Sequence, residues 1–461
     1  MTGEVDRQAR AHLLRADRQE DICFAIWRRS QGAARATALI QRLILPRDGE
    51  RNVHGNASFE PRFLERAMAE AAAAGAGLAL MHSHPLGRGA QGMSSDDIAA
   101  EQSNAAAVFG ATTMPLVGLT LAGDGAWSAR FWERSAPRSY PGAWCASVRV
   151  MGDSLRPTFK GELAPVPKST DEQIRTISAW GAESHADLVR LRAGVVGAGS
   201  VGGVVAESLV RTGFEDVTLI DFDVVKKHNL DRLSYATRRD VGRRKVDVLA
   251  DHLRERATAA NFRALPVPAA VYEEDGYREA LDCDLLFACV DRPWGRYVLN
   301  FIAYSHLIPV FDGGIRARSN RLGKLAAADW RAHTATVGRP CLLCLGQYDP
   351  GHVQLEREGM LDDPRYIEGL PKDHPLKARE NVFAFSVACA SLQMLQMLAM
   401  VLNPLDQPNP GSQLFHFVGS FMEEQKFGAC CPECLFPSLA ARGDSSGISV
   451  IGSRPQTAGA T

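Results

Sequence analysis

Several features that mark other protein classes are missing from this chain. It has no excess of either charge, because 52 Lys and Arg face 53 Asp and Glu, so no overall field holds nucleic acid or an anionic membrane. No apolar run reaches the roughly 18 residues that span a bilayer, and the N-terminal stretch is too charged for a secretory signal. We therefore expect a cytoplasmic protein with no nucleic acid or membrane partner.

Cysteine is also scarce. Ten cysteines in 461 residues are too few and too uneven for a disulfide scaffold. Four of them form two C-x-x-C pairs, Cys341 with Cys344 and Cys431 with Cys434. Four thiolates suit a closed, tetrahedral zinc ion, and disulfides are disfavoured in the cytoplasm. The pairs therefore predict one structural zinc site.

The remaining pattern is that of an α/β protein with more than one core. Residues 1–135 mix strand-like runs with an Ala-rich helix and predict one domain, and scattered prolines over 136–169 predict a linker. Residues 170–440 predict a Rossmann-like, doubly wound parallel sheet, and the Ser- and Gly-rich 441–461 a flexible tail. The expected strands are 22–27, 37–45, 78–82, 193–196, 217–221, 284–290 and 308–312, and the expected helix is 61–74.

The first constellation of polar residues lies on an expected strand of the N-terminal domain. His82 and His84 are two residues apart, so they project from the same face of that strand. Ser94 and Asp97 follow at an expected helix start, where Asp97 can return a carboxylate to the two imidazoles. Three protein ligands and an open position are typical of a catalytic zinc site. The alternative is partly buried polar surface, with Ser94 and Asp97 forming only a capping box.

This set, with an acidic residue before an N-terminal strand, resembles the JAMM (MPN or JAB-type) metalloprotease family over about residues 10–130. The nine residues between His84 and Ser94 exceed the family's usual spacer, and a Gly-rich stretch can absorb the insertion. The resemblance implies zinc on His82, His84 and Asp97. It also implies that Ser94 donates to the developing oxyanion and that the substrate is a peptide or isopeptide bond at the C-terminus of a ubiquitin-like protein.

The identity of the general base is less clear from the sequence. Both Glu20 and Asp21 precede the first strand, and counting along the family pattern favours Asp21. We choose Glu20, because the longer carboxylate better reaches a zinc-bound water, takes its proton and passes it to the leaving amine. If neither acid reaches the water, the domain is a binding module without turnover.

The second constellation begins with a glycine-rich turn between a strand and a helix. Gly197, Gly199 and Gly202, with Ser200 between them, aim backbone N–H groups and a positive helix end at phosphate. Asp221, nineteen residues after Gly202, ends the next strand and suits a ribose in either NAD or ATP. A dehydrogenase therefore remains an alternative at this point.

The residues that follow favour ATP. Asp223, Asn229, Arg232 and Lys245 add two cations and an amide beyond the strand end, more than a dinucleotide pyrophosphate needs. A triphosphate attacked at its α-phosphate needs such cations, which stabilise the reacting centre and the departing pyrophosphate. Asp291 ends a later strand and supplies a carboxylate for Mg²⁺.

Together these motifs closely resemble the ThiF/MoeB superfamily, the adenylating domains of ubiquitin-like activating enzymes, over about residues 170–440. The resemblance implies that Asp221 holds the ribose, that the phosphates lie among Asn229, Arg232 and Lys245, and that Asp291 is the magnesium ligand. A similar four-cysteine zinc site occurs in the family at this place in the chain.

Two family features are missing. The Arg-Gln-Ile segment that reaches across a dimer interface is replaced by Glu172-Gln173-Ile174, with Arg175 nearby as a substitute. Between Cys344 and Cys430 the only candidate for a thioester cysteine is Cys389, in an apolar helix-like run where a packing role is favoured. We therefore predict adenylation more firmly than thioester formation.

The leading hypothesis is a bifunctional enzyme. The C-terminal domain adenylates the C-terminal glycine carboxylate of a ubiquitin-like or sulfur-carrier protein, and the N-terminal domain processes that protein with zinc. Its cofactors are ATP, Mg²⁺ and two Zn²⁺ sites, and its partners include a second copy of the chain and a conjugating-enzyme-like protein. The alternative is adenylation of a peptide or small-molecule carboxylate, with the N-terminal domain acting as a binding module. A non-catalytic adaptor is a third hypothesis.

Overall fold

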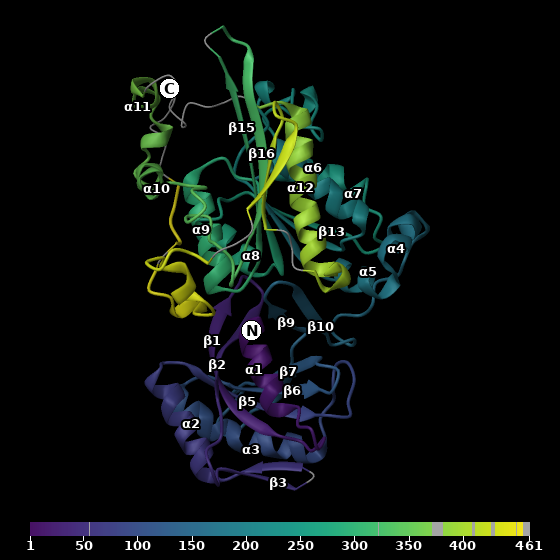
Figure 1. Cartoon of the computed structure of the whole chain (residues 1–461), viewed down its shortest axis with the longest axis vertical. Helices are drawn as coiled ribbons and strands as arrows, with labels where there is room; N and C mark the ends of the chain where they lie inside the picture. The colour runs from purple at the N-terminus through teal and green to yellow at the C-terminus, as the bar shows by residue number, and fades with distance from the viewer. Residues whose placement is uncertain are drawn as a thin grey trace. The chain divides into compact units, whose positions relative to one another are not determined.

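The computed structural model describes all residues except 55, 321, 371–380, 408–410, 426–428, 449 and 455–461. The chain divides into two compact units, which are described separately (Figure 1). Unit 1 comprises Met1–Ser30, Ala36–Val166 and Ala440–Ser446, and unit 2 comprises Gln31–Arg35, Pro167–Leu439 and Gly447–Thr461.

Unit 1 is built on a six-stranded sheet with strand order β2-β1-β5-β6-β7-β8. Strands β5 and β6 are parallel, whereas β1 with β5 and β6 with β7 are antiparallel. The elements of unit 1 are α1 (Gly3–Leu13), β1 (Ile22–Gln31), β2 (Ala36–Ile44), β3 (Arg51–His54), β4 (Asn56–Phe59), α2 (Pro61–Ala73), β5 (Gly77–His84), α3 (Ser95–Thr112), β6 (Leu116–Ala122), β7 (Trp127–Trp132), β8 (Gly142–Trp144), β9 (Ser147–Met151) and β10 (Leu155–Phe159).

Alternation along β1 explains why unit 1 has a core on each face of its sheet. Cys23 and Trp27 pack with the apolar side of α1, including Leu13. Phe24 points to the other face and packs on Phe63 of α2 with a ring-centroid distance of 4.7 Å. The sheet is therefore covered on both faces, with α1 on one and α2 on the other.

The segment 136–169 differs from the irregular linker that its prolines suggest. It holds β8, which pairs with β7, and the β9–β10 hairpin, and the boundary between the units falls after Val166. Pro157 is tolerated because β10 belongs to a sheet of only two strands, where one side of each strand needs no ladder hydrogen bond.

Unit 2 contains an eight-stranded sheet with order β13-β12-β11-β14-β15-β16-β17-β18. The first five strands are parallel, and four of them were predicted from the sequence, whereas β13 was not. The last three strands are an unpredicted antiparallel extension. The helices and strands of unit 2 are α4 (Ile174–Trp180), α5 (Ala182–Val189), β11 (Ala193–Val196), α6 (Ser200–Thr212), β12 (Asp216–Ile220), α7 (Lys245–Arg254), β13 (Arg263–Val267), α8 (Glu274–Leu281), β14 (Leu285–Ala288), α9 (Pro293–Ser305), β15 (Val310–Ser319), β16 (Leu325–Ala335), α10 (Pro350–Arg357), α11 (Pro364–Gly369), α12 (Phe383–Leu402), β17 (Ser412–His416) and β18 (Phe421–Gln425).

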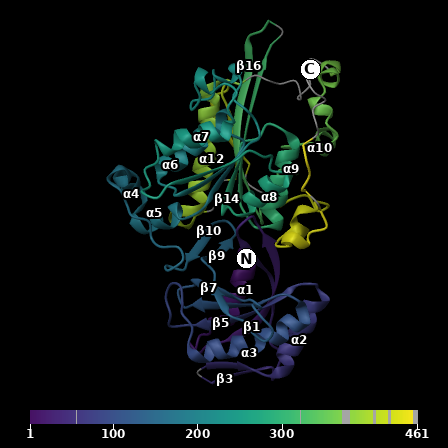
Figure 2. The same ribbon diagram turned by 180° about the vertical axis from the view of Figure 1, so that it is seen from behind.

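Helices cover both faces of the parallel part of this sheet, which confirms the doubly wound prediction. Both views show α6, α7 and α12 on one face and α8 and α9 on the other (Figures 1 and 2). The strand order reverses between β11 and β14, so the crevice at the carboxyl ends of these two strands is the ligand-binding place of such a sheet.

Helix α12 corrects the expectation that no segment of the chain is long and apolar enough to span a bilayer. It has 20 residues and contains an 18-residue stretch with a mean hydropathy of 1.7, so it is long and apolar enough to cross a membrane, although 56% of that stretch is buried inside the protein. Its polar Gln393 donates to the carbonyl of Phe311 at 2.7 Å, and Gln396 accepts from Thr334 at 2.8 Å. These bonds tie α12 to the sheet, as in the core helix of a globular domain.

The described part of the expected tail is folded. Gly443–Ser445 forms a 3-10 helix, Val450 is buried, and Gly452 forms a bridge with Glu273. Residues 455–461 lie outside the described residues.

Candidate functional site

The predicted metal ligands of unit 1 come together. His82 and His84 lie on β5, and Asp97 lies in the first turn of α3. The Nε2 atoms of the two histidines are 3.3 Å apart, and the Asp97 carboxylate oxygens lie 3.6 Å from His82 Nε2 and 3.5 Å from His84 Nε2. One ligand atom from each residue lies within 4.8 Å of the others, which fits a three-ligand metal site.

Ser94 and Asp97 also form the capping box that the alternative reading proposed. The Ser94 Oγ accepts from the Asp97 N–H at 3.1 Å, and Asp97 Oδ2 accepts from the Ser94 N–H at 2.9 Å. The box fixes the start of α3 and holds the Asp97 carboxylate beside the histidines, with Oδ1 facing His82 and the capping oxygen Oδ2 facing His84. The capping and metal-binding interpretations therefore describe the same geometry. The Ser94 side chain is exposed and also hydrogen-bonds to the Asp97 carboxylate.

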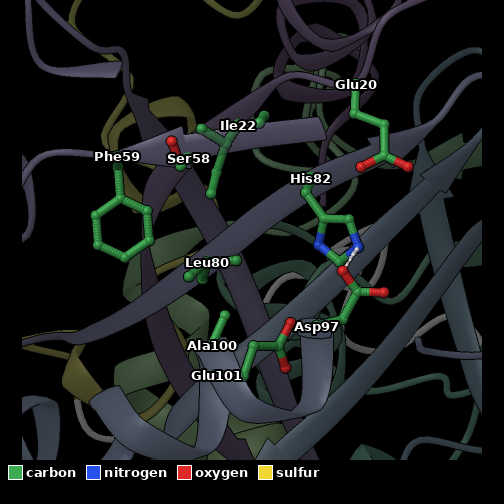
Figure 3. A pocket seen from close by; sticks show the side chains of 10 residues that line it. Glu20, Ile22, Ser58, Phe59, Leu80, His82, Asp97, Ala100 and Glu101 are labelled. Atoms are coloured by element: carbon green, nitrogen blue, oxygen red, sulfur yellow. Dashed lines mark ion pairs between the residues drawn. The ribbon is translucent and has the colours of Figure 1, made fainter. Parts of the chain in front are cut away.

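The structure separates the two acidic residues that the sequence left open. Asp21 is buried, and both of its carboxylate oxygens accept from Arg51 at 2.7 Å. Glu20 instead lines a cavity of about 190 Å³ together with His82 and Asp97. Figure 3 shows its carboxylate extending toward those two side chains. Of the two acids, Glu20 therefore lines the cavity beside the predicted metal ligands, whereas Asp21 is held by Arg51.

The rest of the cavity is mostly apolar. Its other lining residues are Ile22, Ala57, Ser58, Phe59, Leu80, Ala100 and Glu101 (Figure 3). Glu101 accepts from the Nε atom of Arg130 at 2.7 Å and from the Trp132 Nε1 atom at 2.6 Å. Arg130 donates to Thr120, whose hydroxyl lies 3.4 Å from His82 Nε2. This buried network, which the sequence did not reveal, contacts the His82 ring through Thr120 and so helps to fix its orientation.

The protonation of the site suits metal binding. Burial lowers the pKa of His82 to about 3, so its imidazole is neutral at physiological pH. Burial acts to raise the pKa of Asp97, but the hydrogen bond with His84 and the nearby His82 outweigh it and hold that pKa below its ordinary value. Burial raises the pKa of Glu20, as expected of a general base.

In unit 2 the glycine-rich turn joins β11 to α6 at the reversal of strand order. Gly197 has a φ of +97°, and a Cβ there would lie 2.5 Å from the carbonyl oxygen of Cys289, so only glycine fits. A Cβ on Gly202 would collide with the Gly197 carbonyl oxygen. Gly199 precedes the first residue of α6, Ser200, whose buried hydroxyl has no hydrogen-bond partner among the described residues. An unpaired buried donor at a helix N-terminus fits a phosphate oxygen.

The acidic residues after β12 are bonded into this turn. Asp221 accepts from the Ala198 N–H and from the Asp223 N–H, both at 2.7 Å. Lys245, at the start of α7, donates to Asp223 at 2.7 Å, and its Nζ atom lies 4.0 Å from Asp221. Burial acts to lower the pKa of Lys245, but these two carboxylates outweigh it and raise that pKa, so the ammonium stays charged.

The remaining predicted phosphate and magnesium residues lie around the same edge. Asn229 is buried, and its side-chain oxygen accepts from the Lys226 N–H at 3.0 Å. Arg232 donates hydrogen bonds to Asp231 at 2.9 Å and to the His228 carbonyl oxygen at 2.7 Å. Its guanidinium is therefore bonded within its own loop. Asp291 follows β14, is exposed, and acts through its charge to raise the pKa of Lys245.

Cys389 is a packing residue. It is buried on α12, and burial raises the pKa of its thiol to about 12. Its sulfur points to the carbonyl oxygen of Arg331 at 3.6 Å, so the structure gives it no thiolate character.

The cysteine pairs of unit 2 also come together, with one correction. The four sulfurs that lie within 4.8 Å of one another belong to Cys341, Cys344, Cys430 and Cys434. The predicted Cys431 approaches only from the side of Cys344, at 3.6 Å between the sulfurs. Cys430 was missed because it lies outside the C-x-x-C spacing, although the Cys-Cys pair is visible in the sequence. The group fits a four-thiolate zinc site.

Comparison with known proteins matches residues 170–434 to the ThiF family. The chain is 31% identical over 193 residues to tRNA threonylcarbamoyladenosine dehydratase 2 of Saccharomyces cerevisiae, covering 40% of each chain. It is 28% identical to the adenylyltransferase and sulfurtransferase UBA4 of Meyerozyma guilliermondii, covering 35% of each chain. It is 27% identical to molybdopterin-synthase adenylyltransferase of Escherichia coli, covering 33% of this chain and 57% of that protein.

The chain thus spans about two fifths of the first of these relatives and just over half of the last. Among solved structures, the Escherichia coli MccB complex with MccA-N7isoASN matches with a TM-score of 0.45 and 17% identity, covering 60% of this chain and 76% of that one.

The parallel sheet, its glycine-rich turn and the charged residues at its carboxyl edge define unit 2 as a nucleotide-binding α/β domain. With the family match covering more than half of the chain, the protein belongs to the ThiF family.

Proposed function

We propose that unit 2 adenylates the C-terminal carboxylate of a ubiquitin-like or sulfur-carrier protein at the carboxyl edge of its sheet. The observation that carries this proposal is the Ser200 hydroxyl at the glycine-rich turn, which is buried and has no hydrogen-bond partner in the described part of the chain. The Asp221 carboxylate, bonded to the same turn at Ala198, lies 4.0 Å from the charged Lys245 ammonium. Adenylyltransferases among the relatives, of which one is molybdopterin-synthase adenylyltransferase, support the reaction class.

Each residue has a distinct part in this reaction. The Ser200 hydroxyl and the N–H groups in the first turn of α6 bind phosphate, because the Ala198 N–H is already bonded to Asp221. Each Asp221 oxygen accepts one N–H group and keeps a lone pair for a ribose hydroxyl. Lys245 and Arg232 stabilise charge on the α-phosphate and on departing pyrophosphate once they leave their carboxylate partners. Magnesium, when bound at Asp291, neutralises phosphate charge.

The test is the exchange of labelled pyrophosphate into ATP. A ubiquitin-like protein ending in Gly-Gly should support exchange, and the same protein with an amidated C-terminus should not. A peptide or a small carboxylic acid that supports exchange equally well would instead favour the alternative substrate. No exchange with any carboxylate, together with no ATP binding, would contradict the proposal.

We further propose that unit 1 is a zinc-dependent peptidase or isopeptidase that processes the same protein. The converging His82, His84 and Asp97, with Glu20 in the adjoining cavity, support this proposal. Zinc supplies Lewis acidity when it is bound. Glu20 accepts a proton from water and delivers it to the leaving amine, and Ser94 donates to the oxyanion.

Cleavage of a ubiquitin-like protein fused through its C-terminus to a reporter tests this second activity. The account expects cleavage that His82→Ala abolishes and that zinc restores to chelated wild-type protein. If the zinc-loaded protein binds the fusion but never cleaves it, unit 1 is a binding module. A homodimer through unit 2 and a conjugating-enzyme-like partner stay predictions.

A further inference from the structure

The first turn of α9 lacks a cap of its own. Arg292 is the residue before this helix, and its side chain makes no capping hydrogen bond. Proline at 293 has no N–H group, so Trp294 carries the first unpaired donor of the helix. Asp291 stands directly before this turn and immediately after the β14 edge. The conformation of this turn therefore determines the position of the Asp291 carboxylate.

The missing cap comes from a separate helix. Glu356 of α10 accepts from the Trp294 N–H at 2.8 Å through its Oε2 atom. Its side chain is only 1% exposed, and its Oε1 atom has no hydrogen-bond partner in the described part of the chain. A carboxylate at the positive end of a helix is favourable, and keeping one oxygen unpaired in the interior is costly, so the position is unusual for a purely structural side chain.

Two further contacts fasten the same turn. Arg292 donates to Asp362, just after α10, at 2.6 Å. The Trp294 ring stacks on Tyr272 with a centroid distance of 3.7 Å and an interplanar angle of 4°. Farther along α9, Asn300 donates to the Tyr348 hydroxyl at 3.2 Å. The segment 348–362 thus hydrogen-bonds to the first turn of α9 and to its middle.

We propose that Glu356 and Asp362 are positioning residues for Asp291. By holding the first turn of α9 from outside that helix, they fix the β14–α9 turn in the geometry that presents the Asp291 carboxylate to the magnesium ion of bound ATP. This inference rests on the proposed adenylation at unit 2. It predicts that loosening the turn weakens the magnesium-dependent part of ATP binding and spares the rest of the nucleotide site.

Three variants of the full-length protein test this role. Glu356→Ala removes the cap, Glu356→Gln keeps an acceptor at the same place, and Glu358→Ala is the matched control. Glu358 belongs to the same segment, is exposed, and bonds to Gln354 within it at 2.6 Å. A thermal melt first establishes that each variant folds. If Glu356→Ala does not fold, Asp362→Asn, which breaks the ion pair to Arg292, takes its place in the measurements below.

The first measurement needs no nucleotide. Hydrogen–deuterium exchange at the Trp294 amide should be at least about tenfold faster in Glu356→Ala, because a lost helix cap exposes that N–H group. Glu356→Gln and Glu358→Ala should match the wild type. For Asp362→Asn the same region should exchange faster by a smaller factor. Unchanged exchange in Glu356→Ala, or in Asp362→Asn where it replaces that variant, would overturn the inference.

The second measurement is calorimetric titration with ATP, with and without magnesium. Glu356→Ala should weaken the binding of magnesium-ATP about tenfold and change magnesium-free ATP binding less than about twofold. Equal weakening under both conditions would mean general damage and would overturn the positioning role. If the wild type binds no ATP under either condition, the proposed function fails, whereas the amide exchange result still decides whether Glu356 holds the turn.

Discussion

The two candidate sites differ in how far they are assembled before any ligand binds. In unit 1, His82, His84 and Asp97 already point their ligand atoms at one another. In unit 2, Lys245 and Arg232 are bonded to the carboxylates of Asp223 and Asp231. The first site needs only a metal ion, whereas the second needs a phosphate that draws its cations away. The difference follows from the elements that supply the residues. The first site comes from one strand and one helix start, whereas the second comes from three strand ends and the loops that follow them.

The four-cysteine group extends this comparison and gives the largest expected effect. It is assembled like the first site, yet its halves come from segments about ninety residues apart. Cys434→Ser should lose about one zinc per chain and unfold unit 2, because binding free energy at such a site is folding free energy. Zinc analysis and a thermal melt measure both effects. Cys145→Ser in unit 1 is the control, and equal behaviour of the two variants would contradict a zinc site.

Lys245→Ala tests whether the cations of the second site act on phosphate. Pyrophosphate exchange should fall about 10²–10³-fold, because a charged donor to the reacting phosphate is lost. Lys227→Ala, which removes an exposed cation of the neighbouring loop, is the matched control and should retain exchange. Similar losses in both variants would mean that overall positive charge, rather than the Lys245 position, matters.

Glu20→Gln and Asp21→Asn test the division of labour between the two acids of unit 1. Glu20→Gln should keep zinc and stability and lose about 10²-fold or more of the cleavage rate, because the proton acceptor is gone. Asp21→Asn should lower the free energy of unfolding by about 3 kcal/mol, because the Arg51 guanidinium loses its carboxylate partner and faces a buried neutral group instead. Denaturant unfolding and the cleavage assay separate the two. The reverse pattern would restore Asp21 as the catalytic acid.

The last prediction is a pH dependence of stability that belongs to Glu356. Burial raises its pKa to about 7 from an ordinary 4.5, with Arg292 opposing the shift and Asp291 and Asp362 adding to it. A raised acid pKa means that the folded state binds more protons, so stability is lost as pH rises from about 4.5 to about 7. The loss is about 3 kcal/mol at most.

Denaturant unfolding of the wild type and of Glu356→Gln at a series of pH values measures this dependence. The free-energy difference between the two proteins should change across that window and be constant above it. Tyr272 and Arg357 also face this turn, through contacts with the Trp294 ring. Burial raises the pKa of Tyr272 above its ordinary value, so its hydroxyl stays neutral across this window. A constant difference at every pH would contradict the raised pKa.

The sequence predicted what depends on short-range pattern. The expected strand at 193–196 and helix at 61–74 match β11 and α2 within one residue, because burial and caps are local signals. The histidine pair and its Asp97 partner were found for the same reason. The choice of Glu20 over Asp21 rested on an argument about reach and stays a prediction, and the buried contact between Asp21 and Arg51 is consistent with it.

What the sequence could not give depends on contacts between distant segments. The Glu101–Arg130 pair, the choice of Cys430 and the cap from Glu356 join residues 29, 89 and 62 positions apart, respectively, and no periodic pattern marks such partners. The antiparallel strands β16 to β18 were likewise missed. The strands within 136–169 were not predicted, because proline occurs both in edge strands and in loops, and its presence in the sequence does not distinguish the two.

A crystal structure with a non-hydrolysable ATP analogue and magnesium tests the account most directly. It should show the phosphates at the turn from Gly197 to Ser200, with Lys245 moved from Asp223 to a phosphate oxygen and magnesium on Asp291. Nucleotide bound elsewhere, or bound here while Lys245 stays on Asp223, would contradict the claim that this sheet edge assembles around the phosphates of ATP.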